Sequence, residues 1–274
     1  MSDQKTGTLG MTSLYRYFVR GSWLALLLLV LAALPVSASA GSTGTGHDPL
    51  ACSEDLLATV ADALHLGDPD QLSTCRRDPT SPDQWIVALY FPAPASPGHD
   101  EGAYNLALVI WNTKKAMPVA TLMQPNAVEF DDPIRGSTTI DTARYKLADG
   151  VRAFGVRNSL STSCGGCTYS ETKLALYVPS GRTLRPILST HVYLSGDGFN
   201  VNGCSNALRQ VKTTLEPAPT VTNGWNDLTL TTTKSYIDVD ADEKPCGAPE
   251  SKVVKVSYDG KSYGEDVNAA AYKD

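Results

Sequence analysis

Hydrophobic and polar positions along the chain change from a helical to a strand-like spacing at about residue 85. Within residues 54–65, apolar side chains recur three and four positions apart, at Leu56, Leu57, Val60, Ala61 and Leu64. Ser53 stands where a helix N-cap belongs, and Gly67 stands where helices commonly end. The pattern predicts one short amphipathic helix over residues 54–65, which would lie with its apolar side on a sheet.

From Trp85 onward, short β-branched and aromatic runs alternate with Pro, Gly, Asn and Asp, a pattern typical of antiparallel strands. The predicted strands are 85–91, 104–111, 119–123, 151–157, 174–178, 184–188, 226–237 and 253–258. An Asp259-Gly260 turn predicts a last hairpin into residues 261–263.

Two stretches, residues 84–124 and 152–192, share their pattern at a constant offset of 68 residues. The tripeptide Leu106-Ala107-Leu108 matches Leu174-Ala175-Leu176, and Pro118 matches Pro186. Unrelated hairpins can share such a pattern, so an internal repeat and a chance likeness both stay open. Either way the local unit is a three-stranded meander. The predicted fold is mainly β, with antiparallel meanders forming a sandwich or an open propeller-like array.

The first 40 residues predict a secretory signal peptide. Arg16 and Arg20 precede an uncharged leucine-rich run over 24–34, and the small residues Ala38-Ser39-Ala40 follow. This run is shorter than the roughly 20 residues that span a bilayer. We therefore expect cleavage after Ala40, with an uncleaved anchor as the alternative, and a periplasmic or secreted protein with no stable membrane insertion after cleavage.

The mature chain divides into three predicted parts. Residues 41–50 form a flexible terminus, residues 51–264 a single β-rich domain, and residues 265–274 a flexible tail. The whole chain has 23 basic and 29 acidic side chains, and cleavage removes three of the former and one of the latter, which leaves a net charge of −8. An acidic chain of this kind argues against nucleic acid as a partner.

All cysteines lie in the exported part, and their even number in an oxidising compartment predicts disulfides. Sequence proximity favours Cys52 with Cys75, Cys164 with Cys167, and Cys204 with Cys246. The Cys164-Gly165-Gly166-Cys167 motif also fits a redox dithiol or part of a zinc site. No helix signal follows the motif and no second CxxC is present, so a structural cystine in a loop is the favoured interpretation.

Asp238, Asp240 and Asp242 alternate as the ligands of a calcium loop do. An EF-hand also needs a glycine at its sixth position and a glutamate at its twelfth, where this chain has Glu243 and Pro249. The sequence therefore excludes an EF-hand and leaves an irregular calcium site as the one candidate cofactor site, against a solvated acidic loop.

No catalytic residue is predicted. The four histidines are scattered, and neither a Gly-x-Ser-x-Gly elbow nor an HExxH motif is present. A hydrolase site assembled from distant residues stays open. The favoured function is a non-catalytic protein that binds a protein or glycan of the cell envelope through its loops. The alternatives are a calcium-binding module, a thiol-disulfide protein and a hydrolase.

Three segments resemble a group of uncharacterised exported proteins of Gram-negative bacteria. They are Ile140 to Leu147, Gly150 to Arg157, and Ser257 to Tyr263. The resemblance covers about residues 80–264 and implies a periplasmic or secreted bacterial protein. It implies no activity, cofactor or catalytic residue.

Overall fold

The structure is a computed structural model that describes residues 52–94, 102–129, 135–164, 167–238, 244–269 and 272. Of residues 135, 163, 164 and 167 it describes only the backbone. The predicted signal peptide and the predicted terminus at 41–50 lie outside the described residues.

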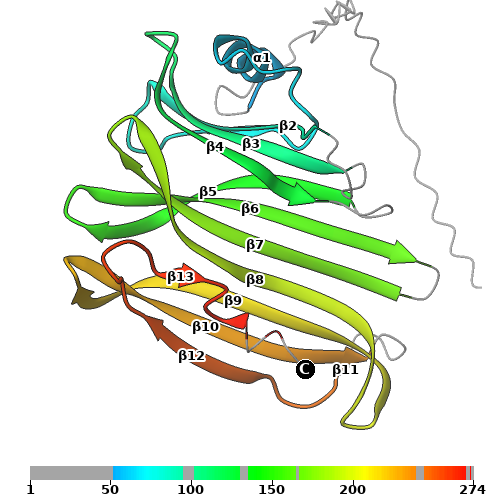
Figure 1. Cartoon of the computed structure of the whole chain (residues 1–274). Helices are drawn as coiled ribbons and strands as arrows, with labels where there is room; N and C mark the ends of the chain where they lie inside the picture. Colours follow the sequence, from blue (N-terminus) through cyan, green and yellow to red (C-terminus); the bar gives the residue numbers. More distant parts are fainter. Residues whose placement is uncertain are drawn as a thin grey trace, which may run out of the picture. The chain divides into compact units, whose positions relative to one another are not determined.

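The described chain is mostly strand (Figure 1). Its elements are α1 (Glu54–Ala63), β1 (Thr74–Arg77), β2 (Gln84–Pro92), β3 (Ala103–Asn112), β4 (Met117–Glu129), β5 (Arg135–Ala148), β6 (Val151–Cys164), β7 (Cys167–Ser180), β8 (Thr183–Val201), β9 (Cys204–Thr222), β10 (Trp225–Asp238), β11 (Lys244–Pro245), β12 (Glu250–Val256) and β13 (Gly264–Glu265). The predicted mainly β class with one N-terminal helix is confirmed.

The helix α1 forms where the sequence predicts it. The Ser53 hydroxyl accepts a hydrogen bond from the Leu56 N–H at 3.2 Å, which satisfies one of the unpaired donors of the first turn. The buried residues Val60 and Ala61 pack on β2 and β3, and α1 therefore covers the outer face of these strands (Figure 1).

The other face of β2 and β3 packs against β5, β6 and β7. Alternate residues of a strand point to opposite faces, so Ile86, Ala88 and Tyr90 face away from the helix. They join a buried cluster that includes Ile140, Phe154, Val156 and Tyr177. Two layers of strand thus enclose the first core, in the manner of a sandwich.

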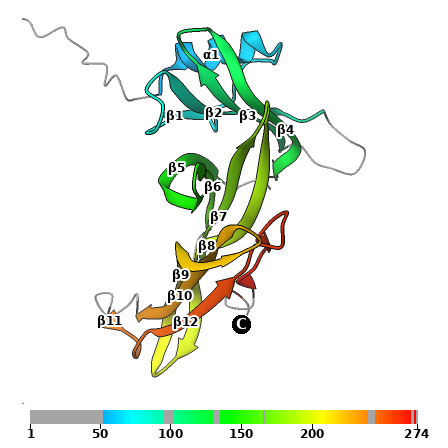
Figure 2. The same ribbon diagram turned by 90° about the vertical axis from the view of Figure 1, so that its left-hand side faces the viewer.

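A second core lies on the opposite face of β5 to β8. The strands β5, β6, β7, β8, β9 and β10 follow one another as an antiparallel meander, and β12 pairs with β10. Buried leucines of β7 and β10, such as Leu176 and Leu228, meet in a cluster with Tyr258 and Tyr263. Figure 2 shows β9, β10 and β12 following β8 in sheet order.

The strands β1 to β4 join the meander that begins with β5 at one parallel bridge, between Thr121 of β4 and Thr183 of β8. The path through the sheet runs β1-β2-β3-β4-β8-β7-β6-β5, so β1 and β5 stand at its two ends. In the described chain β1 pairs only with β2, and β5 pairs only with β6.

The two stretches at the 68-residue offset form meanders of the same strand order, β2-β3-β4 and β6-β7-β8. In each, a register shift lies beside the matched proline, where Trp111 pairs with Pro118 and Tyr177 pairs with Pro186. Proline has no N–H for the ladder, which explains the shift. The number of residues between the two paired positions differs between the meanders, since Trp111 pairs with Pro118 but Tyr177 with Pro186. The likeness therefore extends to strand order and not to register.

Several strands differ from the predicted ones. Residues 135–148 and 204–222 form β5 and β9, which the pattern did not predict, and β8 is 19 residues long. Their many Thr, Ser, Lys and Arg side chains weaken the alternation on which the prediction relied. The strands β8 and β9 pair with neighbours on both sides. In the described chain, β5 pairs with β6 alone.

The C-terminal part also differs from expectation. The predicted hairpin strand at 261–263 is wrong, because the Asp259 carboxylate caps the turn by accepting from the Lys261 and Ser262 N–H groups, and the chain then pairs in parallel with β8 as β13. Of the predicted flexible tail at 265–274, the structure describes residues 265–269 and 272. Among these, Tyr272 is buried, and its hydroxyl donates a hydrogen bond to the His191 carbonyl at 3.0 Å.

Candidate functional site

The structure contains two disulfides among the described side chains. Cys52 and Cys75 have Cα atoms 5.0 Å apart and tie the start of α1 to β1. Cys204 and Cys246 have Cα atoms 6.1 Å apart and tie the start of β9 to the segment after β11. Both pairs are those expected from sequence proximity.

The backbones of Cys164 and Cys167 pair at the tip of the β6–β7 hairpin. Their side chains lie outside the described part of the structure, so both the predicted cystine and the redox alternative stay predictions. The neighbouring segments are strands, in agreement with the absence of a helix signal after the motif.

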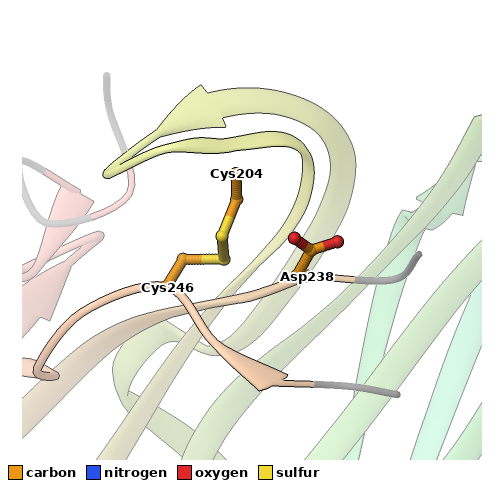
Figure 3. A group of neighbouring side chains, drawn as sticks. All are labelled: Cys204, Asp238 and Cys246. Carbon is orange, nitrogen blue, oxygen red and sulfur yellow. A yellow bond between two sulfur atoms is a disulfide. The ribbon is translucent and has the colours of Figure 1, made fainter. Parts of the chain in front are cut away.

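Asp238 ends β10 beside the Cys204–Cys246 disulfide (Figure 3). The carboxylate and the two sulfur atoms lie within 4.8 Å of one another, which is close enough for three ligands of one metal ion. Metal binding to cysteine requires thiolates, and the disulfide removes both. Asp240 and Asp242 lie outside the described residues, so the predicted calcium site remains a prediction.

A groove between β1 and β5 brings together residues that are distant in sequence. It consists of two adjoining cavities that share Asp78, Pro79 and Thr142. The first has a volume of about 530 Å³ and lies between β1 and residues 139–142 of β5. The second has a volume of about 300 Å³ and reaches past Arg152 to the β7 end. We call these cavities together the β1–β5 groove. Such volumes fall in the range of ligand pockets.

The β5 wall of the groove is shaped by a bulge between Asp141 and Tyr145, where the register with β6 shifts. Arg157 donates from Nε and Nη2 to Asp141 Oδ2 at 2.8 and 2.6 Å, and the Tyr145 hydroxyl donates to the same oxygen at 2.9 Å. Asp141 Oδ1 accepts from the Ala143 N–H at 2.8 Å. These bonds fix the bulge that presents Thr142 to both cavities.

The titration of this cluster reflects the same contacts. Burial alone would raise the pKa of Asp141, but hydrogen bonds from the Ala143 N–H and from Arg157 outweigh burial and hold the pKa below its usual value. Burial, followed by the Asp141 charge, raises the pKa of Tyr145 to about 12. At neutral pH the carboxylate is therefore ionised and the phenol remains a donor to it.

Three arginines line the groove. Arg76 Nη1 donates to the Ile140 carbonyl at 3.4 Å, Arg77 Nε to the Pro82 carbonyl at 2.8 Å, and Arg152 Nη2 to the Thr142 carbonyl at 2.7 Å. Each guanidinium carries five N–H groups, and these bonds use one nitrogen of each. A ligand can therefore be met by the other N–H groups of the same side chains.

Asp78 is the one acidic residue among the described residues that line the groove. Its Oδ1 accepts from the Thr80 N–H and hydroxyl at 2.8 and 2.7 Å. The groove is thus locally basic in a chain whose formal net charge is −6. Its chemistry suits carboxylates, which arginine binds through paired hydrogen bonds.

A second polar cluster surrounds His191 of β8. Its Nε2 lies 3.7 Å from Glu171 Oε2 on β7, and its Nδ1 lies 3.4 Å from Asp266 Oδ1. The His191 contact is the largest cause, ahead of the Tyr169 hydroxyl, of a Glu171 pKa lowered to about 2. This cluster shares no residue with the groove and fastens the C-terminal segment to the sheet.

The groove residues carried no signal in the sequence. Arg76 and Arg77 belong to a four-residue strand, and Thr142 and Arg152 belong to another part of the chain. The resemblance segments 140–147 and 150–157 contain the bulge residues, but the resemblance implied no site residue. The sequence did not single out His191, because its two carboxylate neighbours are distant along the chain, one on β7 and one in the C-terminal segment.

Comparisons with protein-family models, with curated proteins and with solved structures found no match. Within the described residues, no helix combines the length and the apolar character needed to cross a membrane.

Proposed function

We propose that this chain is an exported, non-catalytic binding protein of the cell envelope that holds an anionic protein or glycan in the β1–β5 groove. The observation that carries the proposal is the presence of three arginines along the two adjoining cavities of the groove, Arg76 and Arg77 at the first and Arg152 at the second, in an acidic chain. Charges of one sign lining a concave surface concentrate ligands of the opposite sign.

Two further observations support the proposal. The disulfides fit a protein of an oxidising compartment, as export through the predicted signal would require. The groove also has rigid walls, because β1 is tied to α1 by the Cys52–Cys75 bond and β5 is held by the Arg157–Asp141 pair. A preformed site loses less conformational entropy on binding.

The proposal is tested by calorimetric titration of the mature protein with poly-L-glutamate and with an oligogalacturonate, at low and moderate salt. The variant carries Arg76→Glu and Arg77→Glu. The matched control carries Lys212→Glu and Lys252→Glu, which make the same change in net charge at exposed positions of β9 and β12.

We expect at least one of the two anions to bind, with affinity reduced more than tenfold in the arginine variant and by less than threefold in the lysine control. Equal losses in the two variants would mean that only net charge matters, and the site assignment would fail. Turnover of ester, glycoside or peptide substrates that disappears on changing one polar side chain would contradict the non-catalytic part.

A further inference from the structure

Within the residues that the structure describes, the β1–β5 groove is bounded by two open strand edges. The strands β1 and β5 end the path through the sheet, and each has one hydrogen-bonded neighbour in the described chain. Figure 2 shows β5 below β1, and the larger cavity lies between them. An edge of this kind presents unpaired backbone groups that another strand can use.

The backbone groups that face the groove can be identified on β1. The Asp78 N–H donates to the Gln84 carbonyl at 3.0 Å, so Asp78 faces β2. Along an antiparallel strand the groups alternate in direction, and the N–H and C=O groups of Arg77 and Cys75 therefore point away from β2. They form a short row of donors and acceptors on the open side of β1.

On β5, the Ile140 carbonyl points toward β1, because it accepts from Arg76 Nη1. The distance of 3.4 Å is at the long end for a hydrogen bond. Arg76 is exposed, so its side chain can leave this carbonyl and meet a ligand carboxylate instead.

We infer that the β1–β5 groove binds an extended acidic peptide segment of a partner protein, which adds as a strand to the open edge of β1. This inference rests on the proposed function and names the class of its ligand. Main-chain hydrogen bonds to an open edge supply affinity in strand addition, and side-chain contacts supply specificity. Here Arg76, Arg77 and Arg152 favour carboxylate side chains.

The size of the edge limits the length of the segment. The four residues of β1, at about 3.3 Å each, give an edge about 13 Å long. A peptide with four or five residues in contact is long enough to pair with Cys75 and Arg77. Its alternate side chains can lie on the face of Arg76, whereas Arg77, as the next residue of the strand, lies on the opposite face. A glycan would use the arginines without using the backbone row.

The experiment uses the mature protein and a fluorescent eight-residue peptide of alternating glutamate and valine, with binding followed by fluorescence anisotropy. Two further peptides carry N-methyl groups on every second residue, one on the glutamates and one on the valines. A strand presents alternate N–H groups to opposite edges, so each pattern blocks one edge. A lysine–valine peptide and an oligogalacturonate of equal charge complete the set.

We expect the acidic peptide to bind and the lysine–valine peptide not to bind. One N-methyl pattern should weaken binding more than tenfold and the other by less than threefold. The Arg76→Glu, Arg77→Glu variant should also weaken binding more than tenfold, whereas the Lys212→Glu, Lys252→Glu control should not. The methylated peptides are tested on the unmodified protein, so this readout does not depend on the folding of any variant.

Equal affinities of the two methylated peptides would overturn strand addition, as would an oligogalacturonate that binds as tightly as the acidic peptide at the same arginines. The proposed function would survive either result, because an anion would still occupy the groove. If neither anion responds to the arginine substitutions, both the strand addition and the proposed function are wrong.

Discussion

Replacing Gly155 by alanine should destabilise the protein, because no room exists for a methyl group at this point of β6. Gly155 pairs with Asp141 on β5 and with Leu176 on β7. A Cβ atom there would lie 2.6 Å from Leu174 Cδ1, 3.1 Å from Asp141 Cβ and 3.3 Å from Leu176 Cδ2. Both leucines are fully buried, so neither can move into solvent.

The magnitude follows from the packing. Inserting a methyl group into a close-packed core costs about 1–3 kcal/mol. For a domain of this size, each kcal/mol corresponds to roughly 2–4 °C in melting temperature, so a cost of about 2 kcal/mol lowers it by about 4–8 °C. Thermal unfolding followed by circular dichroism, with urea unfolding at unchanged slope, measures both quantities.

The matched control is Gly196→Ala on β8. The nearest atoms to a Cβ at this position are the Thr168 carbonyl oxygen at 3.8 Å and Phe199 Cε2 at 4.0 Å, which are ordinary contacts. We expect the control to be unchanged, or more stable by up to about 1 kcal/mol through the lower entropy of the unfolded chain. A Gly155→Ala protein that melts within 1 °C of the parent (roughly 0.5 kcal/mol or less) would refute the close packing of β6 on β7.

Three further predictions concern other parts of the chain. Ionised Glu171 stabilises the fold above its ordinary pKa of 4.5, and this stability is lost as pH falls toward the folded pKa of about 2. The side chain introduced by Glu171→Gln carries no charge, so the free energy of unfolding of this variant in urea should change less with pH over this window. An equal change with pH in the parent and the variant would contradict the prediction. Arg157→Met leaves the half-buried Asp141 without its cation and should cost about 1–3 kcal/mol in urea unfolding; a cost below about 0.5 kcal/mol, the level of an ordinary surface change, would show the pair to be unimportant. Intact mass of the exported protein should correspond to a chain that begins at Gly41, and a mass that retains the leader would favour the anchor.

The local elements follow from the sequence. Ser53, the apolar spacing after it and Gly67 were sufficient for α1, because capping and helical periodicity depend on neighbours in the chain. The nearly continuous apolar runs of β2 and β3 likewise located two strands whose faces are both buried, one by the helix and one by the second layer.

The partners of these elements did not follow from the sequence. Period-two alternation tells which side chains share a face, but not which strand lies opposite. The polar strand β5 carried almost no alternation. It pairs with β6, and contacts of Asp141, Arg157 and Arg152 hold its bulge. Tyr272 was expected in a flexible tail because no local pattern marks a contact with β8.

The sequence by itself determined the helix, the main strand class, the acidic charge and the pairing favoured for the cysteines, since each depends on composition or short spacing. Only the tertiary structure decided the groove. Arg76 on β1 and Ile140 on β5 are 64 residues apart along the chain, and the order of strands between them sets their distance. A groove between the two ends of a sheet path forms only when the whole path is folded.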